Sequence, residues 1–259
     1  MDIVIIGSGN VAHCFSHRLQ LNGHQIRQVI SRNREHAREL AEQLNTPYSD
    51  DLLDIDMNAD VYLIAIQDDA IPAVNQELRL GKRIVAHTAG AVPLDAIRNI
   101  SVNTGVIYPL QSLRREMREV EKIPLLLEAA NEMTLRRLGA LAEALSEQVV
   151  TADSEKRLQL HLAAVLSNNF TNHLIARCED YCEKRGLDFG LLRPILHETF
   201  QRIERNDARQ VQTGPAYRND VTTLELHRGQ LKDNPDLLQL YEVLSNDIRQ
   251  FYDVERKAP

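Results

Sequence analysis

Short, continuous apolar runs alternate with mixed polar stretches along the first half of the chain. The runs are rich in β-branched residues, which is typical of parallel strands covered on both faces. They predict strands over Ile3–Ile6, Ile26–Ser31, Val61–Ile66, Arg83–His87, Gly105–Tyr108, Lys122–Leu127 and Gln148–Thr151. Helical patterns lie between them, over Val11–Leu21, Arg34–Gln43, Ile71–Glu77 and Met133–Ser146. The alternation predicts a doubly wound α/β domain over residues 1–153.

The pattern changes after Asp153, where apolar residues recur at helical spacing and no further strand is predicted. The expected helices cover Ser154–Lys184, Asp188–Glu204, Asn219–Leu231 and Asn234–Tyr252. Residues 154–259 are therefore predicted to form a second, all-α domain. No Gly/Ser-rich linker separates the halves, so we expect them to pack closely with a cleft between them.

Composition narrows the function classes. The 259 residues carry a net charge of −7 without a basic block, which disfavours nucleic-acid binding. No apolar run is long enough to span a membrane, and no signal peptide is recognisable, so a cytoplasmic protein is expected. The three cysteines, Cys14, Cys178 and Cys182, are too few for a disulfide framework. No further ligand pair stands near the last two, so no metal site is expected.

The first predicted strand ends in the turn Gly7-Ser8-Gly9-Asn10-Val11-Ala12, which opens the first helix. This strand–turn–helix context is the one that a dinucleotide-binding turn requires. The first glycine allows the tight turn, the second lets the backbone approach a diphosphate, and a small third residue lets helix and strand pack. We expect Gly7, Ser8, Gly9, Asn10 and Val11 to hold a nucleotide, with a purely structural turn as the alternative.

The end of the second predicted strand bears on the choice of cofactor. NAD-binding domains place a carboxylate about 20 residues after the turn, where it holds the ribose hydroxyls. This chain has Ser31, Arg32 and Asn33 there, and its first acidic residue is Glu35. Hydroxyl, guanidinium and amide groups can bind a 2′-phosphate, which a carboxylate would repel. The sequence therefore favours NADP over NAD, and it disfavours a methyltransferase; solvated residues at a helix start are the alternative.

Polar residues follow several of the other predicted strands. In open α/β sheets, ligands bind beyond the carboxyl ends of the strands. Ile66 ends the third predicted strand and Gln67 follows it, and both are expected along the nicotinamide ribose. His87 ends the next predicted strand and Thr88 follows it; His87 is either a site residue or a buried structural histidine. Tyr108 and Gln111 are expected at the rim.

The first helix of the second half carries polar groups among apolar ones. Its segment HLAAVLSNNFTNH is apolar almost all round, which predicts burial. His161, Asn168 and Asn172 would fall on one stripe of a regular helix. Because a buried unpaired amide costs about 1–3 kcal/mol, these groups either face a polar ligand or bond to another helix. We expect them to line the substrate cleft.

These motifs together resemble one family. The GSGNVA turn, HTAG, YPLQSL, HLAAVLSNNFTNH and QTGPAYRND are similar to the Rossmann-like proteins that carry a C-terminal DUF2520 domain. The resemblance covers essentially the whole chain, and it implies a relative of pyrroline-5-carboxylate reductase and the β-hydroxyacid dehydrogenases. It further implies an N-terminal Rossmann-type NADP domain and a homodimer built through the C-terminal helices.

One departure bears on the mechanism. β-Hydroxyacid dehydrogenases carry a catalytic lysine three or four residues before an Asn pair, where this chain has Ala164 and Val165. His161 is therefore the expected general acid or base, since its ordinary pKa lies near neutral pH. The expected function is NADPH-dependent hydride transfer to or from a small polar carbonyl or imine compound. A cofactor-binding sensor or assembly protein without turnover is the alternative.

Overall fold

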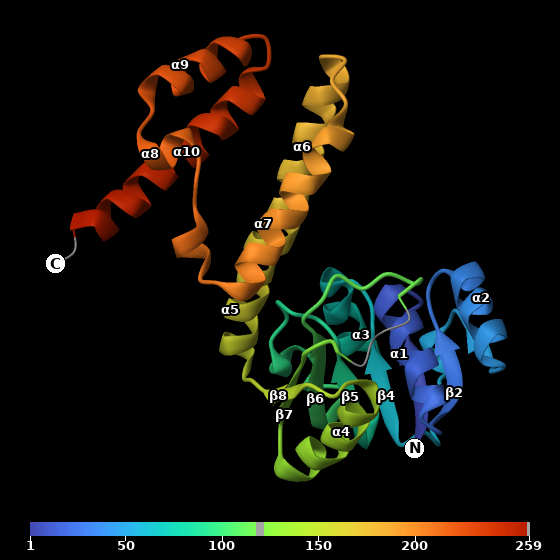
Figure 1. Ribbon diagram of the computed structural model, residues 1–259. Coiled ribbons are helices and arrows are strands. Elements are labelled where there is room, and N and C mark those ends of the chain that lie inside the picture. Colours follow the sequence, from blue (N-terminus) through green and yellow to red (C-terminus); the bar gives the residue numbers. More distant parts are fainter. Residues whose placement is uncertain (118–121, 258–259) are drawn as a thin grey trace. The chain divides into compact units, whose positions relative to one another are not determined.

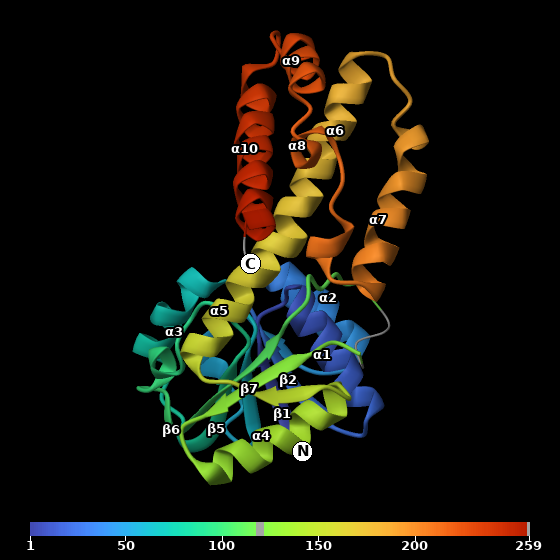
Figure 2. The same ribbon diagram turned by 60° about the vertical axis from the view of Figure 1, so that its left-hand side comes forward.

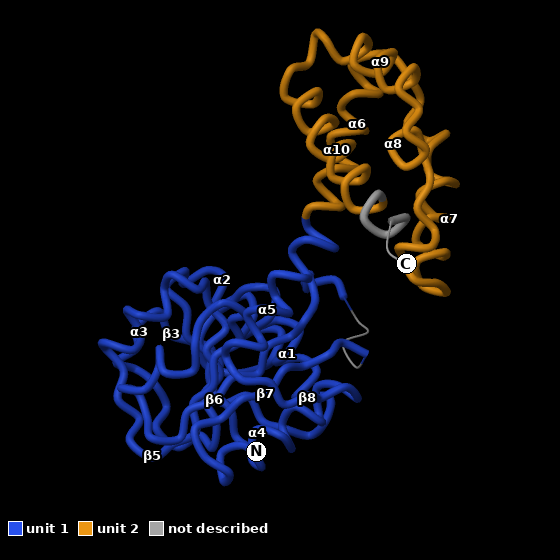
Figure 3. The backbone as a smooth tube through the Cα atoms, turned by 90° about the vertical axis from the view of Figure 1, so that its left-hand side faces the viewer, with its two compact units in different colours: residues 1–169 blue, residues 170–259 orange. Residues whose placement is uncertain are grey.

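The structure is a computed structural model that describes residues 1–117 and 122–257. The chain forms two compact units, Met1–Asn169 and Phe170–Pro259 (Figure 3). The predicted domain boundary after residue 153 stays a prediction, because the described chain is helical from Ser154 onward while the compact units divide at Asn169.

Unit 1 is built on one eight-stranded sheet of order β3-β2-β1-β4-β5-β6-β7-β8 (Figures 1 and 2). Its strands are β1 (Asp2–Ile6), β2 (Gln25–Ile30), β3 (Tyr48–Ser49), β4 (Val61–Ile64), β5 (Gly81–His87), β6 (Ser101–Pro109), β7 (Leu125–Ala129) and β8 (Val149–Thr151). Neighbouring strands are parallel except β6 and β7, which are antiparallel. The predicted Rossmann-type fold is confirmed. The two-residue strand β3 was not predicted, since it is too short to show a pattern.

Helices cover both faces of the sheet because successive side chains of each strand point to opposite faces. Ile3 and Ile5 of β1 pack with α1 (Asn10–Leu21), α2 (Arg34–Leu44) and α4 (Glu132–Leu145) in one core. Val4 and Ile6 pack with α3 (Ile71–Glu77) and the short helix Leu94–Ile97 in the other. Both cores meet at β1, and they fix the ends of β1, β2 and β4 relative to one another.

A helical stretch beginning at Ser154 follows the sheet. It comprises α5 (Ser154–Ala164), a π-helical segment (Val165–Phe170) and α6 (Thr171–Lys184), of which α6 belongs to unit 2. The predicted stretch is confirmed in extent, but it is not one regular α-helix. A π-helical segment has more residues per turn, so it changes which residues share a face.

Unit 2 is entirely helical in its described residues. After α6 come α7 (Arg193–Arg205), α8 (Pro215–Arg218), α9 (Val221–Gln230) and α10 (Pro235–Lys257). Gly214 begins the α8 turn with φ 107°, and the Asp220 carboxylate caps α9 by accepting from the Thr223 N–H at 3.1 Å. No helix in residues 1–117 and 122–257 is long and apolar enough to cross a membrane.

The burial expected for the segment around HLAAVLSNNFTNH is wrong. Arg157 is the one buried residue of α5, and the apolar side chains of the stretch lie at the surface. Those exposed side chains, 47–58% accessible, are Leu158, Leu162, Leu166 and Phe170. They recur every four residues and so form one apolar stripe. An all-round apolar pattern predicts burial, but within unit 1 the side chains of Leu158, Leu162 and Leu166 are uncovered.

Candidate functional site at the carboxyl edge of the sheet

The glycine turn is held in a space that admits no side chain at its first position. Gly7 has φ 125°, and a Cβ atom there would lie 2.0 Å from the carbonyl oxygen of Ala65. Its N–H donates to the Ile30 carbonyl at 2.7 Å. The backbone thus passes between the ends of β2 and β4, which only glycine allows. Gly7 has the role in the turn that the sequence predicts.

The helix that follows leaves its first backbone donors without a side-chain cap. Gly9 is the N-cap of α1 and has no side chain to accept from them. The neighbouring Asn10 side chain donates instead to the Leu113 carbonyl at 3.0 Å, and Val11 is half-buried. Free N–H groups at a helix N-terminus suit a phosphate, with the helix dipole adding to the attraction. The turn therefore fits a cofactor diphosphate.

The end of β2 lies directly beside the turn. The Ser8 hydroxyl donates to the Ser31 hydroxyl at 2.9 Å, which joins the two predicted parts of the cofactor site. The Asn33 side chain caps α2 by accepting from the His36 N–H at 3.1 Å. Arg32 is exposed and has no hydrogen bond or ion pair within the described residues. A free guanidinium and a serine pair fit a 2′-phosphate.

The predicted residues at the ends of β4 and β5 differ in how exposed they are: Ile66 and Gln67 follow β4, His87 is the last residue of β5, and Thr88 follows it. Ile66 is half-buried, Gln67 is exposed and Thr88 is buried. The ring of His87 is fully buried, and its Nδ1 accepts the Ala89 N–H at 3.2 Å. Burial, with the nearby Arg157 charge adding, lowers the pKa of His87 to about 4. His87 is therefore a neutral group that shapes the loop beneath the surface.

Two predicted features meet over the loop after β5. The Tyr108 hydroxyl and His161 Nδ1 lie 2.9 Å apart, with their rings edge to face at 5.8 Å. Tyr108 comes from β6 and His161 from α5. Beneath them lies Gly90, where a Cβ atom would be 2.8 Å from both His161 Nδ1 and Tyr108 Cζ. The glycine of the HTAG loop thus makes room for the Tyr–His pair.

The environment of the pair keeps the tyrosine protonated. Burial raises the pKa of the Tyr108 hydroxyl, the Asp68 charge adds to this, and the Arg157 charge opposes it. A neutral phenol beside an imidazole can donate a proton and then recover one through the ring. Sequence reasoning placed Tyr108 only at the rim. Its position at the carboxyl end of β6 indicated a place at the edge of the sheet. Nothing in the sequence indicated that its partner would be His161 of α5.

A buried ion pair anchors the helix that carries His161. Arg157 is 1% exposed, and its guanidinium donates to the Glu128 carboxylate of β7. It also donates to the Val92 carbonyl at 2.6 Å and to the Ser154 hydroxyl at 3.2 Å. One side chain thereby ties α5 to β7 and to the loop that contains Gly90. No sequence pattern marked Arg157 or Glu128, because the residues lie 29 positions apart.

The asparagines of the predicted stripe are divided between the two units. Asn168 is exposed in the π-helical segment, and its amide donates to the Ser112 hydroxyl at 2.9 Å. Asn172 is exposed on α6 in unit 2. The structure thus brings Asn168 to the segment after β6 and His161 to Tyr108. Ser112 was not predicted as a site residue.

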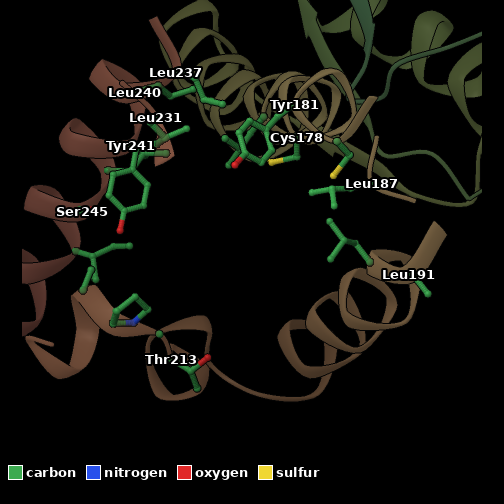
Figure 4. A pocket seen from close by; sticks show the side chains of 18 of the residues that line it. Cys178, Tyr181, Leu187, Leu191, Thr213, Leu231, Leu237, Leu240, Tyr241 and Ser245 are labelled. Carbon is green, nitrogen blue, oxygen red and sulfur yellow. The ribbon is translucent and has the colours of Figure 1, made fainter. Parts of the chain in front are cut away.

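Unit 2 has a hollow of its own. Helices α6, α8 and α10 with the segments between them surround a cavity of about 670 Å³ (Figure 4). Leu231, Leu237 and Leu240 are among the mainly apolar side chains that point into it, and the few polar groups include Tyr241 and Ser245.

Two of the three cysteines lie at this hollow. Cys178 and Cys182 line the cavity as free thiols, and burial, with Cys182 adding, raises the pKa of the Cys178 thiol. No group of three metal-ligating side chains occurs among residues 1–117 and 122–257. The cavity is therefore an apolar surface without evident chemistry.

Two protein families match the chain. Residues 123–248 match the domain of unknown function DUF2520, and residues 2–90 match a family described as NADP oxidoreductase coenzyme F420-dependent. The crystal structure of the "putative NADP oxidoreductase BF3122" from Bacteroides fragilis is 34% identical with a TM-score of 0.89, covering 96% of this chain and 98% of that one. No curated protein matches the chain.

More distant solved structures share the fold. Pyrroline-5-carboxylate reductase from Streptococcus pyogenes is 15% identical with a TM-score of 0.63, covering 96% of this chain and 98% of that one. A reductive aminase from Aspergillus terreus, in complex with NADPH and ethyl-5-oxohexanoate, is 14% identical with a TM-score of 0.73, covering 96% and 94%.

Proposed function

Because the chain belongs to the Rossmann-like NADP oxidoreductases that carry a DUF2520 domain, we propose that it is an NADPH-dependent reductase of a small polar carbonyl or imine compound. The observation that carries the proposal is the Tyr108–His161 hydrogen bond at the carboxyl edge of the sheet. NADPH, when bound, supplies the hydride. Gly7, Ser8, Gly9, Asn10 and Val11 would hold its diphosphate.

The remaining cofactor contacts follow the strand ends. Ser31, Arg32 and Asn33 would bind the 2′-phosphate, where the free Arg32 guanidinium supplies the charge. Ile66, Gln67 and Thr88 would line the path of the nicotinamide half. His87, being fully buried and neutral, would support this loop from below and make no contact with substrate.

Proton transfer would fall to the Tyr108–His161 pair. A carbonyl or imine that receives hydride also needs one proton at its oxygen or nitrogen. The protonated Tyr108 hydroxyl can donate it, and His161 can return a proton to the phenolate through their 2.9 Å contact. Asn168, held by Ser112, and Asn172 would orient polar groups of the substrate. Acid–base work would then need no lysine at the position of Ala164 or Val165.

The test is NADPH oxidation in the presence of cyclic imines and α-keto acids, followed by absorbance, for the wild type, Y108F and H161A. We expect each substitution to lower kcat/KM about 10²-fold or more, since general acid catalysis contributes about that much. The affinity for NADPH, measured by calorimetry, should stay unchanged.

A second Tyr–His pair provides the matched control. The Tyr241 hydroxyl and His227 Nδ1 of unit 2 are also 2.9 Å apart, with rings edge to face at 5.7 Å. Y241F should leave turnover intact. If NADPH binds, no candidate substrate is turned over and H161A changes no measurable property, the enzyme proposal is wrong and a cofactor-binding sensor is the better description.

We also propose that the protein is a homodimer formed through its helical part. Unit 2 buries only five of its described residues, Cys182, Ala216, Leu224, Leu231 and Ser245. Large apolar side chains on α7, including Ile195, Phe200 and Ile203, are 44–64% exposed. A second copy of this chain has the same exposed apolar helices. In a dimer these helices would cover one another and fill the cavity of Figure 4.

A further inference from the structure

The segment Leu110–Met117, here called the strap, follows β6 and lies against the glycine turn. It is held to the turn and α1 by three hydrogen bonds of different origin. The Asn10 amide donates to the Leu113 carbonyl at 3.0 Å, and the Cys14 thiol donates to the Arg114 carbonyl at 3.3 Å. The Arg115 guanidinium donates to the Ser8 carbonyl at 3.3 Å.

The strap is packed as well as hydrogen-bonded. Leu113 is 8% exposed and belongs to the core between α1 and the sheet, and Met117 packs against the same core. A segment anchored in this way presents its exposed side chains at a defined place. The exposed side chain that lies at the glycine turn is Arg115.

Most of the N–H donors of the Arg115 guanidinium have no hydrogen-bond acceptor among the described residues. It has five N–H donors, but its contacts within the described residues are the single bond to Ser8 and a 3.9 Å ion pair with Glu39. The pair is exposed, with side chains 38% and 46% accessible, and such pairs stabilise a fold little. By contrast, Arg27 has two carboxylate partners at 2.7 Å and 3.1 Å. Arg115 is therefore placed, yet it keeps donors for a further acceptor.

The positive charge of Arg115 affects His13, which lies close to the glycine turn. Together with burial, which is the larger cause, it lowers the pKa of the neighbouring His13 to about 4. His13 lies one turn into α1 and is 5% exposed, so it stays neutral. Arg115 thus places a positive charge beside this helix N-terminus, in a protein whose net charge is −7.

We propose that Arg115 is a further cofactor-binding residue, which contacts the diphosphate held by the glycine turn. The inference rests on the proposed NADPH function. It assigns the diphosphate and not the 2′-phosphate because Arg115 bonds to the turn itself, whereas Arg32 stands at the end of β2. A guanidinium offers a phosphate two parallel hydrogen bonds.

Calorimetric titration of NADPH and NADH into the wild type, R115Q, R32A and R114Q tests the assignment. R115Q should weaken both nucleotides by about tenfold or more, because a charge-assisted hydrogen bond is lost in each case. R32A should weaken NADPH far more than NADH. R114Q, on the neighbouring strap residue, should change neither.

Two further measurements separate binding from folding. R115K should recover part of the affinity, and the dissociation constant of R115Q should depend less on salt than that of the wild type. A loss confined to NADPH in R115Q, or an affinity equal to that of R114Q, would overturn the diphosphate contact. Failure of the wild type to bind either nucleotide would instead contradict the proposed function.

Discussion

The two units differ in how many of their apolar side chains they bury. Unit 1 covers both faces of its sheet and buries 26 hydrophobic residues in one core and 15 in the other. Unit 2, by contrast, buries five of its described residues and surrounds a mainly apolar cavity of about 670 Å³. Exposed apolar side chains of this kind are typical of a surface that another protein covers. The contrast supports the proposed dimer, in which a second copy would cover them.

The two Tyr–His pairs have the same hydrogen-bond distance but different surroundings. Both pairs have a hydroxyl–Nδ1 distance of 2.9 Å. Tyr108 and His161 are fixed by Gly90 beneath them and by the buried Arg157 on the same helix. The pair of Tyr241 and His227 lies exposed between α9 and α10. Equal geometry therefore does not imply equal function, because the first pair lies at the carboxyl edge of the sheet, where we propose that NADPH binds, and the second does not.

The largest expected loss of stability comes from replacing a glycine by alanine, and it should differ between one glycine of each unit. G7A sets a Cβ atom 2.0 Å from the Ala65 carbonyl oxygen at φ 125°, whereas G186A at φ 66° meets nothing within 4 Å. We expect G7A to lower the free energy of unfolding by more than about 4 kcal/mol and to abolish NADPH binding. G186A should cost about 1 kcal/mol, from its left-handed backbone. Thermal unfolding and calorimetry measure both; equal losses would contradict the crowding at Gly7.

The second prediction compares a buried ion pair with an exposed one. R157M leaves the Glu128 carboxylate without its main partner, so we expect a loss of about 3–5 kcal/mol in the free energy of unfolding. R202A removes the exposed Arg202–Glu198 pair of α7, which should cost about 0.5 kcal/mol. Urea denaturation of both variants measures these free energies of unfolding. The double variant E128Q/R157M should regain part of the stability that R157M loses. Similar values for R157M and R202A would show that Arg157 does not anchor α5.

The elements of both units were predictable from sequence, but their packing was not. The strand and helix ranges follow from local periodicity, and Gly7 and Asp220 occupy the turn and cap that their residue types favour. The Tyr108–His161 contact joins residues 53 positions apart, and no single-sequence pattern encodes such a pairing. The apolar residues around Leu162 predicted burial, which unit 1 alone does not supply. The periodicity of a sequence predicts that a side chain is apolar enough to be buried, but it does not identify the surface that covers it.

The third prediction places the same charge at two exposed leucines. Leu21 of unit 1 is 81% exposed and Leu191, which lines the cavity of unit 2, is 77% exposed. L21E should change nothing measurable. L191E should weaken the proposed dimer by about 100-fold or more, because burying a leucine contributes about 1.5–3 kcal/mol and the interface contains the residue twice. Sedimentation velocity over a concentration series measures this, and a wild type that stays monomeric at every concentration would contradict the dimer.

The smallest effect is a pH dependence that belongs to unit 1. The pKa of His87 is lowered to about 4 by burial, while an unfolded histidine titrates near 6.5. Between these values the unfolded chain binds a proton that the folded unit does not, so stability is full above pH 6.5 and falls as the pH falls toward 4. The slope from His87 approaches about 1.4 kcal/mol per pH unit. Urea unfolding between pH 7 and pH 4.5 should show it, and H87Q should remove the part of the slope that His87 contributes, while His13, whose pKa is also lowered to about 4, keeps its own part. If H87Q and the wild type lose stability equally on acidification, the ring does not stay neutral, and its burial beneath the loop cannot be what shapes the site.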